Sequence, residues 1–150
     1  QNIWHKLFKL INHFSIQMPD KSKKILTEIS TGELLDKITI LEIKLVKIKD
    51  KENLLEINKE YESLKETKNS NIKLTKNLEK LIIQLKEINL KLWDIEDKKR
   101  ICEKNKDFGQ AFVDLSRSVY LNNDKRANIK SEINKILGSN IREIKQYANY

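Results

Sequence analysis

The segment that decides the fold is STGELLDKITILEIK, residues Ser30–Lys44. Ser30 followed three residues later by Glu33 is a capping box, in which the Ser30 hydroxyl accepts from the Glu33 amide. In the same motif the Glu33 carboxylate reaches back to the Ser30 amide. Such a cap stabilises a helix start by about 0.5–2 kcal/mol. We therefore predict that a helix begins at this point.

Apolar side chains then recur every three or four residues, which is typical of a helix with one buried face. The members of this stripe are Leu34, Ile38, Leu41, Leu45 and Ile48. The same period returns in residues 54–64 and, for a longer run, in residues 78–95. We predict a tight turn at residues 49–52 and a loop at residues 66–71. The long run covers only about two and a half heptads, which favours a helical hairpin over a true coiled coil.

Further capping signals divide the C-terminal part into shorter helices. Asp107 is predicted to cap a helix that ends where residues 121–124 break or bend the chain. Asp124 is then predicted to cap a second helix that ends at Gly138 in a left-handed conformation. A final short helix is predicted to start at Asn140 and to end in Tyr147 and Tyr150. Three Gly and one Pro in 150 residues disfavour an all-β fold. We predict an all-α helical bundle built on a long antiparallel helical hairpin with a C-terminal helical subdomain.

Residues 1–17 form a separate amphipathic helix in this interpretation, and residues 18–24 a linker to a helical domain at residues 25–150. Four interpretations of this helix are open. It packs on its own domain, it binds a partner, it is the last helix of an upstream domain, or it lies on a membrane surface through residues 3–14. His5 and His13 have no ligand partners at metal-binding spacing.

Composition excludes several classes of protein. The net charge is +8, but only four of the 30 basic residues are arginines, and lysines alternate with glutamates, so a nucleic-acid partner is disfavoured. Cys102 is the only cysteine, which excludes an intramolecular disulfide and a cysteine zinc cluster. No apolar run approaches the roughly 20 residues of a membrane span, and no signal peptide is visible. We expect a cytoplasmic protein.

Residues 25–150 resemble an uncharacterised family of small bacterial and phage-associated helical proteins, a domain of unknown function. Three segments carry the resemblance: the opening segment, then NLKLWDIEDKKR at Asn89–Arg100, then VYLNNDKRANIK at Val119–Lys130. Thr31 departs from the family pattern, which more often has Pro there. The resemblance implies no established activity. It does imply a setting near, or fused to, glycosyltransferase and surface-polysaccharide genes.

Polar residues at helical spacing form a candidate binding site. Asn89, Trp93, Glu96 and Arg100 share one stripe, and Glu33, Lys37 and Lys44 share an equivalent stripe on the first helix. Asp36 is a further candidate on that helix. The other candidates are Arg117, Asn122, Asp124, Arg126 and Lys130. If the stripes face each other, they would line a cleft for an anion such as a phosphate or a sugar nucleotide. The alternative is that Glu33–Lys37 and Glu96–Arg100 are ordinary helix ion pairs.

The acidic residues offer the one route to catalysis, because Glu33 with Asp36, or Glu96 with Asp97, could hold Mg²⁺ over a pyrophosphate. Their spacing is common on solvated helices, so we predict no resident metal or cofactor and leave enzymatic activity open. The predicted function is a binding or assembly module that forms a homo-oligomer or binds a partner protein. The alternative is a small enzyme or sensor for a phosphorylated ligand, a nucleotide or sugar nucleotide.

Overall fold

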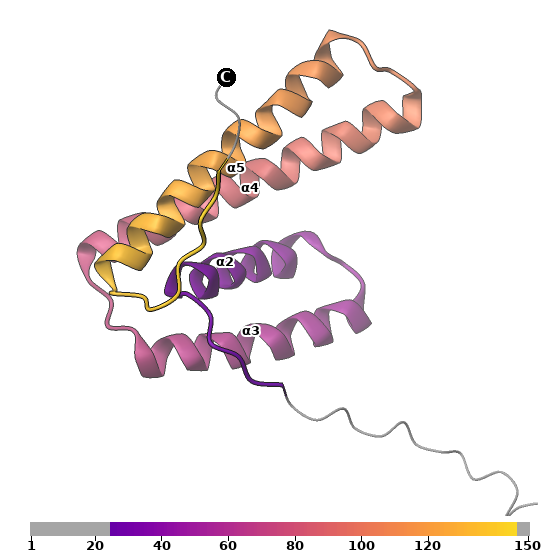
Figure 1. Ribbon diagram of the computed structural model, residues 1–150. Helices are drawn as coiled ribbons and strands as arrows, with labels where there is room; N and C mark the ends of the chain where they lie inside the picture. Colours follow the sequence, from indigo (N-terminus) through magenta and orange to yellow (C-terminus); the bar gives the residue numbers. More distant parts are fainter. Residues whose placement is uncertain (1–24, 147–150) are drawn as a thin grey trace, which may run out of the picture.

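The computed structural model describes residues 25–146, which form four α-helices and no strand (Figure 1). They are α2 (Thr31–Lys47), α3 (Lys51–Asn71), α4 (Lys76–Asn105) and α5 (Gln110–Ile136). The predicted all-α bundle is confirmed. The predicted N-terminal helix at residues 1–17, with its membrane-binding alternative, and the linker at residues 18–24 lie outside the described residues. None of the described helices has an apolar stretch long enough to cross a membrane.

Side chains cap the starts of α2, α3 and α4. Ser30, Asp50 and Thr75 each accept a hydrogen bond from the backbone amide three residues later, so each satisfies a donor that has no partner inside its helix. The predicted cap at Ser30 is confirmed. The Glu33 carboxylate, however, accepts from Lys130 of α5 instead of turning back to Ser30.

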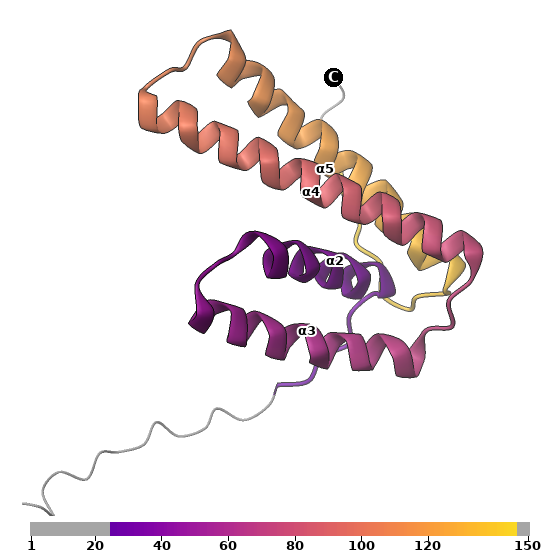
Figure 2. The ribbon, with the colours of Figure 1, turned by 180° about the vertical axis from the view of Figure 1, so that it is seen from behind.

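Helix α2 is the centre of the fold. It contacts each of the other three described helices, whereas α3 contacts α2 alone. Helices α4 and α5 form a long antiparallel hairpin, and α2 lies across one face of it with α3 on the outer side (Figures 1 and 2). Because α2 is covered on two sides, it needs a wider apolar surface than a helix at the edge of a bundle.

The burial pattern of α2 reflects its contacts with α3 on one side and with the α4–α5 hairpin on the other. Leu34, Ile38 and Leu41 are buried, as the apolar period predicts, and Leu35 and Ile43 are buried as well. Leu45 and Ile48, at the end of the predicted stripe, are only half-buried. Against α2 lies a cluster of buried side chains from α4 and α5, namely Leu78, Leu81, Leu85 and Ile133, which surrounds Leu35.

The predicted loop at residues 66–71 is wrong, because α3 continues to Asn71 and the connection to α4 is residues 72–75. Thr67 donates to the carbonyl of Ser63, and Asn71 donates to the carbonyl of Thr67. These polar side chains bond back onto the helix that contains them, so residues typical of a loop are accommodated in the last turns of α3.

The predicted break at residues 121–124 is also wrong, since α5 is continuous from Gln110 to Ile136. Asn122 donates to the carbonyl of Ser118 one turn earlier, which keeps its amide inside the helix. Asp107 does not cap α5 either; Gly109 is the N-cap, and the Asp107 carboxylate accepts from its amide. The predicted C-terminal subdomain is therefore the second arm of the long hairpin.

The end of α5 is partly as predicted. Gly138 has φ +62°, the left-handed conformation expected after a helix C-terminus. The predicted helix from Asn140 is wrong, because residues 139–146 run without helical structure. Asn140 donates to Glu28, and Glu143 binds Lys130, so both side chains are engaged by other parts of the chain. Tyr147 and Tyr150 lie outside the described residues.

Gly32 allows the closest approach between α2 and α5. A Cβ atom there would lie 2.6 Å from the Lys130 carbonyl oxygen and 2.9 Å from Asn134 Oδ1. We expect Gly32→Ala to lower the free energy of unfolding by about 1–3 kcal/mol, because the two helix backbones would have to separate. Urea unfolding followed by circular dichroism measures the loss.

The matched control is Gly109→Ala, where the nearest atom to the new Cβ is the mobile carboxylate of Asp107 at 3.3 Å. Its unfolding free energy should change far less. Equal losses in both variants would contradict the close-approach role of Gly32.

Candidate functional site

Lys130 lies where α5 meets the first turn of α2, and only 8% of its surface is exposed. The missing side chain at Gly32 brings the two backbones together at this point. Asn134, one turn further along α5, accepts from the Gly32 amide at 2.7 Å and from the Thr31 hydroxyl at 3.2 Å. Ser139 Oγ accepts from the Thr31 amide at 3.2 Å. The start of α2 is therefore held against α5 and the segment that follows it.

Three carboxylates surround the Lys130 ammonium group. Its Nζ lies 2.6 Å from Glu33 Oε2, 3.1 Å from Glu143 Oε2 and 3.8 Å from Asp36 Oδ2. Glu33 and Asp36 come from the first two turns of α2, and Glu143 comes from the C-terminal segment. A single buried cation thus joins three parts of the chain.

The network continues from Asp36 into the hairpin. The Asn89 side-chain amide on α4 donates to Asp36 Oδ1 at 2.7 Å and to Thr39 Oγ1 at 2.9 Å. Its carbonyl oxygen accepts from Arg126 of α5 at 3.3 Å. Asp36, Thr39 and Asn89 are each less than 5% exposed. We refer to Glu33, Asp36, Thr39, Asn89, Arg126, Lys130 and Glu143 together as the Lys130 cluster.

Electrostatics keep this cluster charged. Burial alone would lower the pKa of Lys130, but hydrogen bonds to Glu33 and Glu143 and the charge of Asp36 outweigh burial and raise it above 10.5. The hydrogen bond from Lys130 lowers the pKa of Glu143, although partial burial opposes this. Lys130 therefore stays protonated near neutral pH and cannot serve there as a base or nucleophile.

Five candidate residues from the sequence meet in this cluster: Glu33, Asp36, Asn89, Arg126 and Lys130. Thr39 and Glu143 were missed. Thr39 follows Asp36 by three residues on the same helix, so its position was open to prediction. Glu143 was assigned to a helix that does not form, and no signal in the sequence pairs it with Lys130 across the 13 residues that separate them.

The remaining candidates on α2 and α4 lie elsewhere. Lys37 pairs with Glu60 of α3 at 2.6 Å rather than with Glu33. Glu96 pairs with Arg100 at 3.4 Å, as the ordinary ion-pair alternative predicts, and Trp93 is half-buried.

The candidates on α5 are also dispersed. Arg117 is exposed and lies nine residues, or roughly 13 Å, from Arg126 along the helix. Asn122 is buried, and its Oδ1 has no hydrogen-bond partner; Asp124 is half-buried. The cleft predicted from converging arginines requires Arg100 and Arg117 beside Arg126, and the exposed side chain of Arg100 is instead paired with Glu96.

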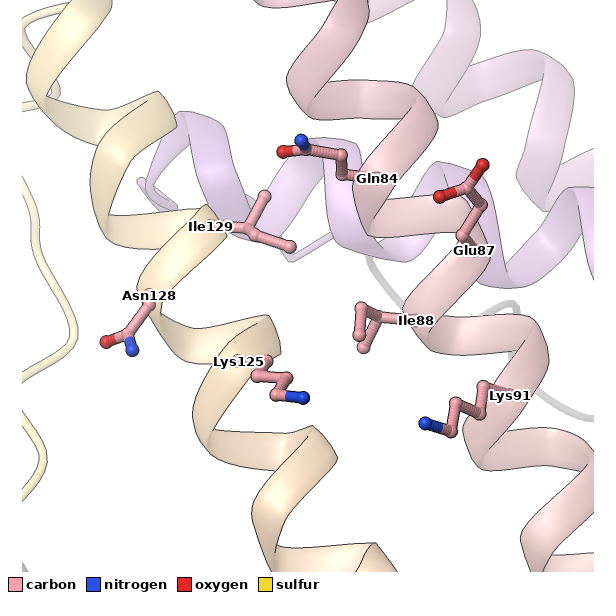
Figure 3. Close-up of a pocket in the computed structure, with 7 residues that line it drawn as sticks. All are labelled: Gln84, Glu87, Ile88, Lys91, Lys125, Asn128 and Ile129. Carbon is pink, nitrogen blue, oxygen red and sulfur yellow. The ribbon is translucent and has the colours of Figure 1, made fainter.

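A groove of about 490 Å³ opens between α4 and α5 (Figure 3). Ile88 and Ile129 face each other across it, and Gln84, Glu87, Lys91, Lys125 and Asn128 surround them. None of the residues predicted for the site lies here. The apolar centre and mixed charges show no convergent set of groups suited to one reaction.

Of the two acidic pairs considered for Mg²⁺, Glu33 and Asp36 both approach the Lys130 ammonium group, and Glu96 pairs with Arg100. Within residues 25–146, no group of three or more His, Cys, Asp or Glu side chains is arranged to hold a metal ion. Around Lys130, where three carboxylates do approach one another, the ammonium group occupies the centre.

Comparison with known protein families matches residues 25–150 to a family of unknown function, DUF6165. The chain belongs to this family. Comparisons with curated proteins and with solved structures found no significant match. The DUF6165 match includes every residue of the Lys130 cluster.

Removal of the central cation should destabilise the DUF6165 domain. Lys130→Met leaves Asp36 buried without its ammonium partner, and we expect a loss of about 3–5 kcal/mol in the free energy of unfolding. Lys125→Met, at an exposed position on the same helix, should stay within about 0.5 kcal/mol of the parent protein. Urea unfolding measures both. A loss no larger than that of the control would show that the carboxylates do not depend on Lys130.

The lowered pKa of Glu143 predicts a specific pH dependence. Its folded pKa lies below the ordinary value of 4.5, so the Glu143 carboxylate stabilises the fold above that value. This stabilisation is lost as pH falls through the lower folded pKa. Glu143→Gln should therefore show a shallower fall in unfolding free energy between about pH 5 and pH 3. Parallel curves for the two proteins would contradict the Lys130–Glu143 interaction.

Proposed function

We propose that the protein is an assembly module that pairs with a second copy of itself through the outer part of the α4–α5 hairpin. This part is residues 96–121, named the distal arm below. The observation that carries the proposal is that the distal arm leaves the rest of the bundle and exposes large apolar side chains.

Ion pairs mark where the other helices stop covering the hairpin. Lys86 of α4 pairs with Glu42 at 2.6 Å, and Lys47, the last residue of α2, pairs with Asp94 at 3.0 Å. Beyond this point both views show α4 and α5 projecting with only each other as neighbours (Figures 1 and 2). Two helices alone bury one face each, so their other faces stay open to a partner.

Large apolar side chains are exposed along the distal arm. Ile101 is 58% exposed, Phe108 50%, Val113 43%, Leu121 41% and Tyr120 39%. Phe108 also stacks edge to face on Phe112, with ring centroids 5.4 Å apart, near the tip of the hairpin. Exposed apolar groups gathered on one projecting element are typical of interaction sites.

The charge of the distal arm favours a second copy over a charged partner. Residues 96–121 carry six basic and five acidic side chains, whereas the whole chain has a net charge of +8. Two arms would therefore approach each other with little net repulsion. Two antiparallel hairpins that pack side by side form a four-helix bundle, and a two-fold axis would give both copies the same interface.

The proposal extends to the setting of the assembly. The resemblance to bacterial and phage-associated proteins implies neighbouring or fused glycosyltransferases. Pairing of the module would bring two such enzymes together in a surface-polysaccharide pathway. This setting is supported by the resemblance alone.

Sedimentation velocity across a concentration series tests the pairing. We expect the parent protein to sediment as a dimer. Ile101→Glu combined with Val113→Glu should raise the dimer dissociation constant by at least about tenfold, because charges would enter an apolar interface. Leu55→Glu on α3, where Leu55 is 72% exposed, is the control and should leave the dimer intact. A parent protein that remains monomeric, or equal weakening by the control, would overturn the proposal.

A further inference from the structure

A second groove, of about 440 Å³, lies between α5 and the C-terminal segment, residues 139–146. This segment turns back at the end of α5 and runs beside the helix (Figures 1 and 2). The groove is separate from the distal arm, so an inference drawn from it is independent of the assembly proposed above. Its volume suits a small molecule.

The far wall of the groove is held in place by specific bonds. Ser139 Oγ accepts from the Thr31 amide and donates to the Ile141 carbonyl at 3.0 Å. Glu143 is bound to the buried Lys130 at 3.1 Å. Ser139 and Glu143 therefore hold the segment beside α5, which reduces the ordering cost of binding a ligand.

Positive charge predominates in the groove. Lys130 and Lys135 of α5 line it together with Arg142 and Lys145 of the segment, and Glu143 is the single carboxylate of the lining. Lys130 is engaged by its carboxylates, and Lys145 lies 3.4 Å from Glu143. No carboxylate of the described residues forms an ion pair with Lys135 or Arg142. These two cations are left to neutralise a bound anion.

Neutral groups in the lining add hydrogen-bonding capacity. Asn128 and Ser131 of α5 contribute an amide and a hydroxyl, and the guanidinium of Arg142 can bind two oxygens of one phosphoryl group at once. Ile144, which is 91% exposed, also lines the groove and offers an apolar surface beside these polar groups.

We infer that this groove binds a phosphorylated small molecule, with its phosphate or pyrophosphate group between Lys135 and Arg142. Glu143 limits the affinity, because its carboxylate lies on Lys130 inside the groove and repels the anion. The Lys130–Glu143 contact thus holds the C-terminal segment beside α5, and the Glu143 carboxylate competes with a bound anion for Lys130.

Isothermal titration of the full chain with inorganic pyrophosphate, at constant ionic strength, tests this inference. Lys135→Ala with Arg142→Ala should weaken binding by at least about tenfold. The matched control is Lys51→Ala with Lys59→Ala, which removes the same charge from exposed positions on α3, away from the distal arm. The control should bind pyrophosphate nearly as tightly as the parent protein. Glu143→Gln removes the repelling charge but keeps an oxygen that can accept from Lys130, so this variant should bind pyrophosphate more tightly.

Three outcomes would overturn the inference. The first is that the parent protein does not bind pyrophosphate. The second is that both double variants lose affinity equally, which would indicate general charge attraction. The third is that Glu143→Gln binds less tightly than the parent protein. Sedimentation velocity tests pairing through the distal arm, and the titration tests pyrophosphate binding in the groove. Failure of one proposal is therefore distinguishable from failure of the other.

Discussion

The interaction on which the structure depends is the contact between the Lys130 ammonium group and the carboxylates of Glu33, Asp36 and Glu143. A buried lysine is costly unless its charge is compensated and its donors are satisfied. Here the compensation comes from the start of α2 and from the segment after α5. The requirement to satisfy one cation therefore positions α2 across the hairpin and holds the C-terminal segment beside α5.

Gly32 and Asn89 make that arrangement possible. Without a side chain at Gly32, the α2 and α5 backbones approach closely enough for Lys130 to reach the first turn of α2. Asn89 then transmits the polar contact into α4 by donating to Asp36 and accepting from Arg126. Buried networks of this kind specify one arrangement of helices, because any other packing would leave charges without partners. The apolar contacts around Leu35 are less selective about register.

The two proposals use opposite ends of the hairpin. The distal arm exposes apolar side chains and is almost neutral, whereas the groove beside residues 139–146 is lined by Lys135 and Arg142, which form no ion pair with a described carboxylate. A module with an assembly surface at one end and an anion site at the other could respond to a ligand without altering its interface. On α5, residues 122–126 lie between the distal arm and Ala127, the first residue that lines the groove.

The sequence by itself determined the helical class, the cap at Ser30 and most of the buried stripe, because these depend on spacing within one helix. It also singled out Glu33, Asp36, Asn89, Arg126 and Lys130, although their binding of a ligand stays a prediction. Only the tertiary structure decided that α5 is unbroken, since the Asn122 amide can bond either to its own helix or elsewhere. The tertiary structure also decided that Glu143 reaches Lys130 and that Arg100 and Arg117 stay apart from Arg126. Each of these findings concerns two residues from different helices or segments, or from distant turns of one helix. The sequence could not predict them, because the periodicity of apolar residues does not show which neighbouring helix covers each face of a given helix.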